Sequence, residues 1–219
     1  MANRIDAPDS PEFGRGLSFT DAIYGFAITL LVVNLDVPSP AAWDSWTGLV
    51  DAGLLGQLFG FVLSFVVIAV FWRVNFRLVR SMSGLTSRVL TANIVCAFFI
   101  VLIPFTTQGI SDPGTRDLAL PTVVYALNIA LASLAQTVMY VLAQRDGLVT
   151  MPTGGPRTVR RQTLFALATP VVFLVSIPVA LTAGALPAHV VWLSLLVIGP
   201  LAGRFAYVTA TRSADAAQT

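Results

Sequence analysis

The stretch RGLSFTDAIYGFAITLLVVNLD, residues Arg15–Asp36, sets a short polar signature directly before an apolar run. From Phe19 to Val37 the only ionisable side chains are Asp21, near the start, and Asp36, near the end. In a helix these 19 residues extend roughly 30 Å, which matches the hydrocarbon layer of a bilayer. The sequence therefore predicts a transmembrane helix over residues 19–37.

One face of this helix carries a regular stripe of side chains. Four of them recur at the spacings i, i+3, i+4 and i+7: Phe26, Thr29, Leu30 and Val33. These positions share one side of an α-helix. Three apolar side chains and one hydroxyl form either a seam between packed helices or the lining of a narrow pore. The periodicity alone leaves both interpretations open and favours the seam.

The composition excludes a soluble globular domain. Of the 219 residues, 56% are hydrophobic and only 11% are charged, too few to cover a soluble domain of this length. Six apolar stretches are each about as long as a membrane span: Phe19–Val37, Leu54–Trp72, Val89–Ile110, Leu120–Leu142, Leu164–Ala183 and His189–Tyr207. The sequence thus predicts an all-α integral membrane protein with six transmembrane helices in each subunit.

The arginines predict the topology. All 13 basic residues are Arg, and all but Arg116 fall on one side of the membrane if both termini lie on that side. The positive-inside rule then places both termini in the cytoplasm. The net charge of +2 reflects this topology and does not indicate nucleic-acid binding. We expect two cytoplasmic tails, residues 1–14 and 211–219, around one six-helix domain, residues 15–210.

Asp21 is an acid inside the first predicted span, where an ionised group is costly unless it is paired or close to the interface. Trp72 ends the second predicted helix and Asn93 lies near the start of the third, at about the same depth. Arg15 lies one or two turns below. An indole N–H, an amide and a guanidinium are suitable partners for a carboxylate. A structural network and a proton-carrying site both fit this pattern, and we favour the network.

Residues that could form a catalytic or metal-binding set are missing from the sequence. The chain has one histidine, His189, one cysteine, Cys96, and one glutamate, Glu12. No HExxH, GxSxG or phosphate-loop motif occurs. We therefore expect no enzyme, no metal site and no cofactor. Two alternative functions remain: a small secondary transporter, ion- or proton-coupled, and a non-conducting structural membrane protein. Transporters usually carry acids or helix breaks near the midplane.

The start of the first predicted helix resembles a known family. Prokaryotic homologues of the endosomal and lysosomal potassium channel, the transmembrane protein 175 family, open this helix with Arg, three residues and then Phe-Ser-Asp. The corresponding residues here are Arg15, then GLS, then Phe19-Thr20-Asp21. Thr20 replaces the family's Ser and keeps the hydroxyl group.

Two further segments are similar to the same family. Its second helix ends in a Trp-containing motif similar to residues 64–72, SFVVIAVFW, and its third helix pairs an early Asn with a later Pro-Phe, similar to Asn93 and residues 104–105. The family commonly has His-His soon after the Trp, where this chain has residues 75–76, Asn-Phe. The resemblance covers the first half of the chain, and the later helices match only in layout.

The resemblance implies a homotetrameric, potassium-selective channel of a bacterial inner membrane, with the first helix of each subunit lining a central pore. By distance from Asp21, the apolar constriction falls on Phe26, Leu30 and Val33, and a selectivity-linked Thr falls on Thr29. The packing seam is then the less favoured interpretation of the stripe. Phe26 stands where an aliphatic residue is typical. The implied structural motif network has six members: Arg15, Phe19, Thr20, Asp21, Trp72 and Asn93.

Overall fold

The structure is a computed structural model that describes residues 5–6, 10–149 and 167–195. Its elements are α1 (Pro11–Val33), η1 (Pro40–Asp44), α2 (Trp46–Asp51), α3 (Leu54–Arg80), α4 (Ser87–Val101), α5 (Ile103–Ser111), α6 (Ala119–Arg145) and α8 (Ala168–Ala183). Residues 185–195 form a further short helix. The strands β1 (Ile5–Asp6) and β2 (Leu85–Thr86) pair antiparallel. The fold is thus helical, as predicted, apart from this one small pair of strands.

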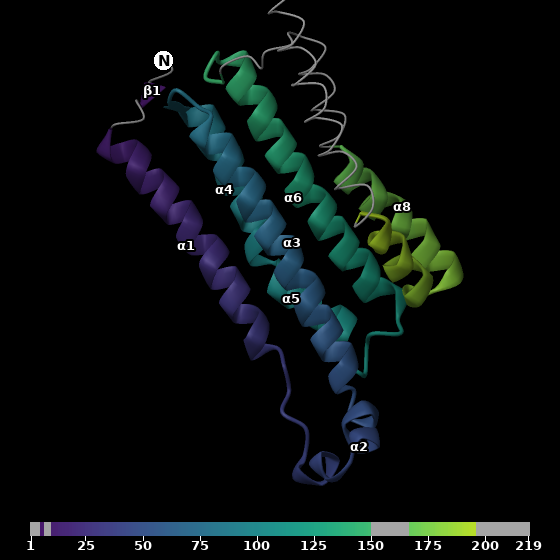
Figure 1. Ribbon diagram of the computed structural model, residues 1–219. Helices are drawn as coiled ribbons and strands as arrows, with labels where there is room; N and C mark the ends of the chain where they lie inside the picture. The colour runs from purple at the N-terminus through teal and green to yellow at the C-terminus, as the bar shows by residue number, and fades with distance from the viewer. Residues whose placement is uncertain (1–4, 7–9, 150–166, 196–219) are drawn as a thin grey trace, which may run out of the picture.

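Four helical segments of the described chain are long and apolar enough to cross a membrane: Pro11–Val33, Leu54–Arg80, Ser87–Ser111 and Ala119–Arg145. They correspond to the first four predicted spans and lie side by side in Figure 1. The helices over residues 168–183 and 185–195 are shorter. The predicted fifth and sixth spans, residues 164–183 and 189–207, extend outside the described residues.

The first helix begins and ends earlier than predicted. Ser10 caps its N-terminus by accepting a hydrogen bond from the backbone N–H of Phe13 at 3.2 Å, and Pro11 occupies the first turn. Residues 11–14, which the sequence analysis assigns to a tail, are therefore helical. The helix ends at Val33, and two prolines, Pro38 and Pro40, follow in the connection, where a helix could not continue.

The second spanning helix, α3, continues beyond Trp72 to Arg80. Three arginines that follow the predicted span, Arg73, Arg77 and Arg80, are therefore helical. Basic side chains near a helix C-terminus interact favourably with the helix dipole, and their long stems cover apolar surface. The described arginines other than Arg116 lie on the elements or loops at the end of the bundle where α1 begins, here called the arginine-rich end.

The third span is broken where α4 meets α5. Pro104 has no N–H to donate to the carbonyl oxygen of Ile100, so the hydrogen-bond ladder of the helix is interrupted near Leu102. Asn128 on α6 donates its amide to the carbonyl oxygen of Phe99 at 3.1 Å, and Asn34, which follows α1, donates to the carbonyl oxygen of Pro104 at 2.7 Å. Two side-chain amides therefore stabilise the bend, as a membrane interior requires.

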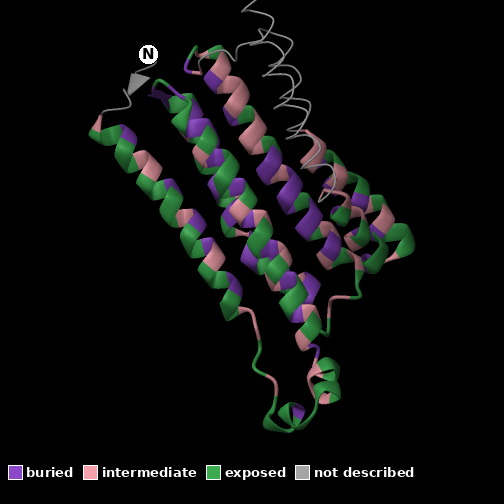
Figure 2. Ribbon diagram, in the orientation of Figure 1, coloured by how far each residue is buried: buried purple, intermediate pink, exposed green. Residues whose placement is uncertain are grey.

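The core is centred on α6, which packs against α4, α5 and α8, while α1 packs against α3, α4 and α5 at one edge of the bundle. Aromatic side chains fill the part of the core next to α8: Tyr125, Phe173 and Trp192 form mutual ring contacts with centroids 5.1–6.3 Å apart. Figure 2 shows the buried residues concentrated along α6 and on the inward faces of its neighbours. The outward faces of α1 and α3 are largely exposed.

Gly60 lies where α3 passes close to α5. A Cβ atom at this position would lie 2.6 Å from the Cβ of Ser111, closer than two carbon atoms that are not bonded to each other can approach. We expect Gly60→Ala to force the helices apart and to lower the free energy of unfolding by about 1–3 kcal/mol, the usual cost of overpacking. Gly14→Ala is the control, because a Cβ there meets no atom within 4 Å. Equal melting temperatures for the two purified variants in detergent would contradict this packing.

Candidate functional site

Helix α1 has two different faces. The face turned toward the bundle is buried and carries Phe13, Thr20, Tyr24, Ala27 and Leu31. These positions recur mainly at spacings of three, four and seven residues, so they form a single stripe along the helix. This stripe fixes the rotation of α1 about its own axis.

The opposite face of α1 is exposed in the subunit. It carries the apolar side chains of Phe26, Leu30 and Val33, which are 71%, 46% and 73% exposed. Thr29 is exposed on the same side, and its hydroxyl group donates to the carbonyl oxygen of Phe26 at 2.9 Å. At 100° per residue, Tyr24 on the buried face lies about 160° around the helix from Phe26. The structure thus brings the four stripe residues together on a face that no described part of the subunit covers.

Small side chains flank this exposed face. Ser18, Ala22 and Gly25 are all exposed, and a Cβ atom at Gly25 would meet nothing within 4 Å. Small residues allow membrane helices to approach closely, since lipid tails provide no hydrophobic force between helices. The exposed face of α1 therefore has the composition of a helix that packs against another helix.

Hydrogen bonds near the arginine-rich end attach α1 to α3 and α4; the bond to α3 is exposed and the bond to α4 is buried. The indole Nε1 of Trp72 donates to Asp21 Oδ1 at 2.9 Å. The amide of Asn93 donates to Thr20 Oγ1 at 2.9 Å, and the amide of Asn75 donates to Asn93 Oδ1 at 2.8 Å. Of the six predicted motif residues, the structure brings together Thr20, Asp21, Trp72 and Asn93. Together with Asn75 they form the anchoring network of α1.

The partners within this network differ in part from those expected. Asn93 donates to Thr20 and not to the Asp21 carboxylate, because Thr20 faces α4 while Asp21 faces Trp72. Arg15 is exposed and makes no hydrogen bond or ion pair with the described residues, and Phe19 is 60% exposed. Both lie on the same side of α1 as Phe26. They are therefore outside the network of a single subunit.

Asn75 is a functional candidate that the sequence analysis did not assign to the network. Its side chain is buried, and its amide also approaches the sulfur of Met139 on α6 at 3.9 Å. A polar residue three positions after Trp72 on an apolar helix is the signal that points to it, because such a side chain needs a buried partner.

The other end of α1 is also held in place. The backbone N–H of Asp36 donates to Gln57 Oε1 at 2.9 Å, and Gln57 is buried on α3. Between the two ends, the hydroxyl group of Tyr24 lies 3.8 Å from the sulfur of Cys96 on α4. With the contact from Asn34 to Pro104 described above, α1 is fixed at three levels.

His189, the one histidine of the chain, packs against other side chains of the bundle. His189 Nε2 lies 3.3 Å from Thr122 Oγ1, and the histidine ring packs on Trp192 at 4.7 Å between centroids. Within residues 5–6, 10–149 and 167–195, no group of three or more His, Cys, Asp or Glu side chains is placed to hold a metal ion.

We predict that Asn93→Leu destabilises the subunit. The substitution roughly keeps the side-chain volume but leaves the buried amide of Asn75 without its oxygen acceptor, at a cost of about 1–3 kcal/mol. Thr91→Val is the matched control, because Thr91 is exposed on the same helix and bonds only to the carbonyl oxygen of Ser87 within it. Unfolding in a denaturing detergent measures both variants. An Asn93→Leu protein as resistant as the control would contradict the anchoring role.

The sequence comparisons point to one family. Residues 15–104 match the model of the family described as "Endosomal/lysosomal potassium channel TMEM175". A protein named as a potassium channel from Chryseobacterium sp. (strain P1-3) is 25% identical over 127 residues, 58% of this chain and 62% of that protein. A potassium channel from Chamaesiphon minutus (strain ATCC 27169 / PCC 6605) is 27% identical over 110 residues, 49% of this chain and 54% of that protein.

The fold is similar to a solved structure, described as the crystal structure of a lysosomal potassium-selective channel TMEM175 homologue from Chamaesiphon minutus. The TM-score is 0.64 at 22% identity, and the match covers 92% of this chain and 99% of that chain. At this identity the likeness shows the fold alone. The match spans only 62% and 54% of the lengths of the two curated relatives. Both relatives are named as channels, and channels are not enzymes. The resemblance to the transmembrane protein 175 family noted in the sequence is confirmed.

Proposed function

Because the chain is a prokaryotic homologue of the TMEM175 family, we propose that four copies form a potassium-selective cation channel whose central pore is lined by α1. The observation that supports this most strongly is the division of α1 into two faces. The anchoring network and the buried stripe hold one face against the bundle, so the face with Phe26, Leu30 and Val33 has a fixed direction. A fixed, exposed face on an edge helix is suited to meet its own copies around a symmetry axis.

The three apolar side chains form the constriction in this proposal. Rings of Phe26, Leu30 and Val33 make a hydrophobic gate, which closes when the narrow segment loses its water. Thr29 supplies hydroxyl groups between two of these rings and replaces part of the hydration shell of the permeant potassium ion. Selectivity then comes from hydroxyl groups and bound water, and is weaker than in a filter of backbone carbonyls.

The charges at the two ends of the bundle support the proposed orientation. The arginine-rich end faces the cytoplasm of a bacterial inner membrane in this proposal, with both termini on that side. Three acids, Asp36, Asp44 and Asp51, lie on the connection after α1 at the opposite end. Acidic residues at a pore mouth raise the local concentration of cations.

The polar groups near the middle of the bundle do not favour a secondary transporter. Thr107 Oγ1 lies 2.6 Å from Ser64 Oγ, which is 3.1 Å from the Tyr125 hydroxyl. Gln136 donates to the carbonyl oxygen of Phe71 at 3.2 Å. These groups bond to one another or to the backbone, as polar side chains between membrane helices do. A substrate site would need them free.

The proposal is tested by current across a planar bilayer that contains the purified protein under a potassium-to-sodium gradient. We expect unitary currents that reverse toward the potassium potential. Leu30→Ala widens the constriction and should raise the open probability or the conductance. Leu127→Ala is the matched control, because Leu127 is 44% exposed against 46% for Leu30 but belongs to α6, which is separated from α1 by α4 (Figure 1).

Two results would count against a pore lined by α1. Equal effects of the two substitutions would show that general destabilisation, and not the pore surface, alters the current. Saturable uptake coupled to a counter-ion, without unitary currents in either protein, would favour the transporter.

A further inference from the structure

A groove runs along the outside of the bundle between α3 and α6 and reaches α8. It encloses about 520 Å³, and its walls are mainly apolar, with Val70, Phe71, Val74 and Leu78 on α3. Along α3 the groove extends from Val70 to Ser81, a distance of roughly 16 Å at 1.5 Å per residue. This length is about half of the ~30 Å hydrocarbon layer, which is the thickness of one leaflet.

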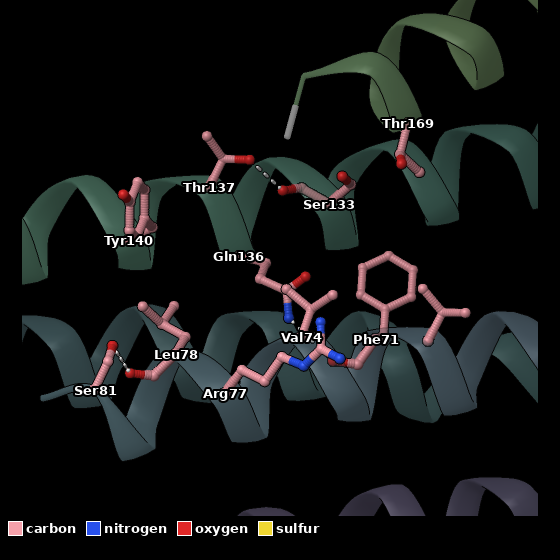
Figure 3. A pocket seen from close by; sticks show the side chains of 11 residues that line it. Phe71, Val74, Arg77, Leu78, Ser81, Ser133, Gln136, Thr137, Tyr140 and Thr169 are labelled. Carbon is pink, nitrogen blue, oxygen red and sulfur yellow. Dashed lines mark hydrogen bonds between the residues drawn. The ribbon is translucent and has the colours of Figure 1, made fainter. Parts of the chain in front are cut away.

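The charge of the groove is entirely positive. Arg77 lines it, and none of the described residues that line it is acidic. Arg77 is exposed and forms no ion pair with any described residue. Figure 3 shows its side chain lying along the groove toward Gln136 and Phe71. Two further arginines, Arg73 and Arg80, lie on the same face of α3 as Arg77, because the three residues are spaced i, i+4 and i+7.

The uncharged polar groups of the groove are largely engaged within the subunit. Thr137 donates to the carbonyl oxygen of Ser133 at 2.9 Å, and Ser81 donates to that of Leu78 at 2.7 Å. The amide of Gln136 donates to the carbonyl oxygen of Phe71. The guanidinium of Arg77 is therefore the group with the most unused capacity to bind an anion, because it has five N–H donors.

We propose that this groove binds an anionic phospholipid from the leaflet at the arginine-rich end. The apolar wall from Val70 to Leu78 accommodates an acyl chain, and Arg77 pairs with the phosphate of the headgroup. Basic pockets between membrane helices recognise such headgroups, and guanidinium groups bind phosphate oxygens in a bidentate manner. A free phosphate ion does not fit as well, because most of the groove is apolar and lies at membrane depth. The site is separate from the exposed face of α1.

Native mass spectrometry of the full-length protein in detergent tests this site directly, without reliance on channel current. The protein is titrated with phosphatidylglycerol, with phosphatidylcholine and, separately, with inorganic phosphate. We expect preferential retention of phosphatidylglycerol and no retention of phosphate. Arg77→Gln should weaken phosphatidylglycerol binding about fivefold, the loss expected for one arginine at a membrane surface. Val74→Trp, which keeps every charge but fills the groove, should weaken the binding of both lipids.

Arg88→Gln is the matched control, because Arg88 is an exposed arginine at the same end of the bundle but does not line the groove. It should leave binding unchanged. Equal losses in the Arg77 and Arg88 variants would overturn the proposal in favour of general surface electrostatics. Undiminished binding in Val74→Trp would also overturn it. If no lipid is retained and Val74→Trp changes the number of subunits in the assembly, the groove is a contact between copies and the proposal is wrong.

Discussion

The structure depends on the need to satisfy polar groups inside an apolar bundle. Thr20, Asn93 and Asn75 place a hydroxyl and two amides at sites where water is excluded, and each finds its partner on a different helix. An unpaired group in such surroundings costs free energy, so the three side chains hold α1, α3 and α4 in a single register. Apolar packing alone would leave α1 freer to rotate or slide, because one aliphatic surface differs little from another.

This register links the fold to the proposed pore. With Thr20 and Tyr24 turned toward the bundle, the side chains of Phe26, Leu30 and Val33 must point away from it. A small displacement of α1 would change the width at every apolar ring, so the bonds that anchor this helix also influence gating in our proposal. The bend between α4 and α5 adds a second constraint, since Asn34 binds the carbonyl oxygen of Pro104 just beyond the end of α1.

Much of this arrangement follows from patterns in the sequence, and the exceptions have physical causes. The length of an apolar stretch is a strong signal for a membrane span, so the first four spans could be predicted. The residues at which their helices begin and end could not. The long stems of Arg73 and Arg77 extend α3 past the apolar run, and the cap at Ser10 starts α1 before it. The bond from Trp72 to Asp21 follows from matching depths. The bond from Asn93 to Thr20 could not be predicted in the same way. Thr20 and Asp21 are neighbouring acceptors, and the rotation of α1 about its axis decides which of them faces Asn93. The sequence also did not predict the groove beside Arg77, which exists only once α3, α6 and α8 are packed.

The central claim is that the exposed face of α1 lines an aqueous pore and does not face lipid. Thiol modification of single-cysteine variants in a Cys96→Ser background tests it most directly. Leu30→Cys and Leu127→Cys replace leucines of nearly equal exposure in the subunit, 46% and 44%. A charged, membrane-impermeant thiol reagent should reduce potassium current through Leu30→Cys and leave Leu127→Cys unaffected. Current that persists in Leu30→Cys while the reagent blocks neither variant would contradict the account, because that face of α1 would then lie out of reach of water.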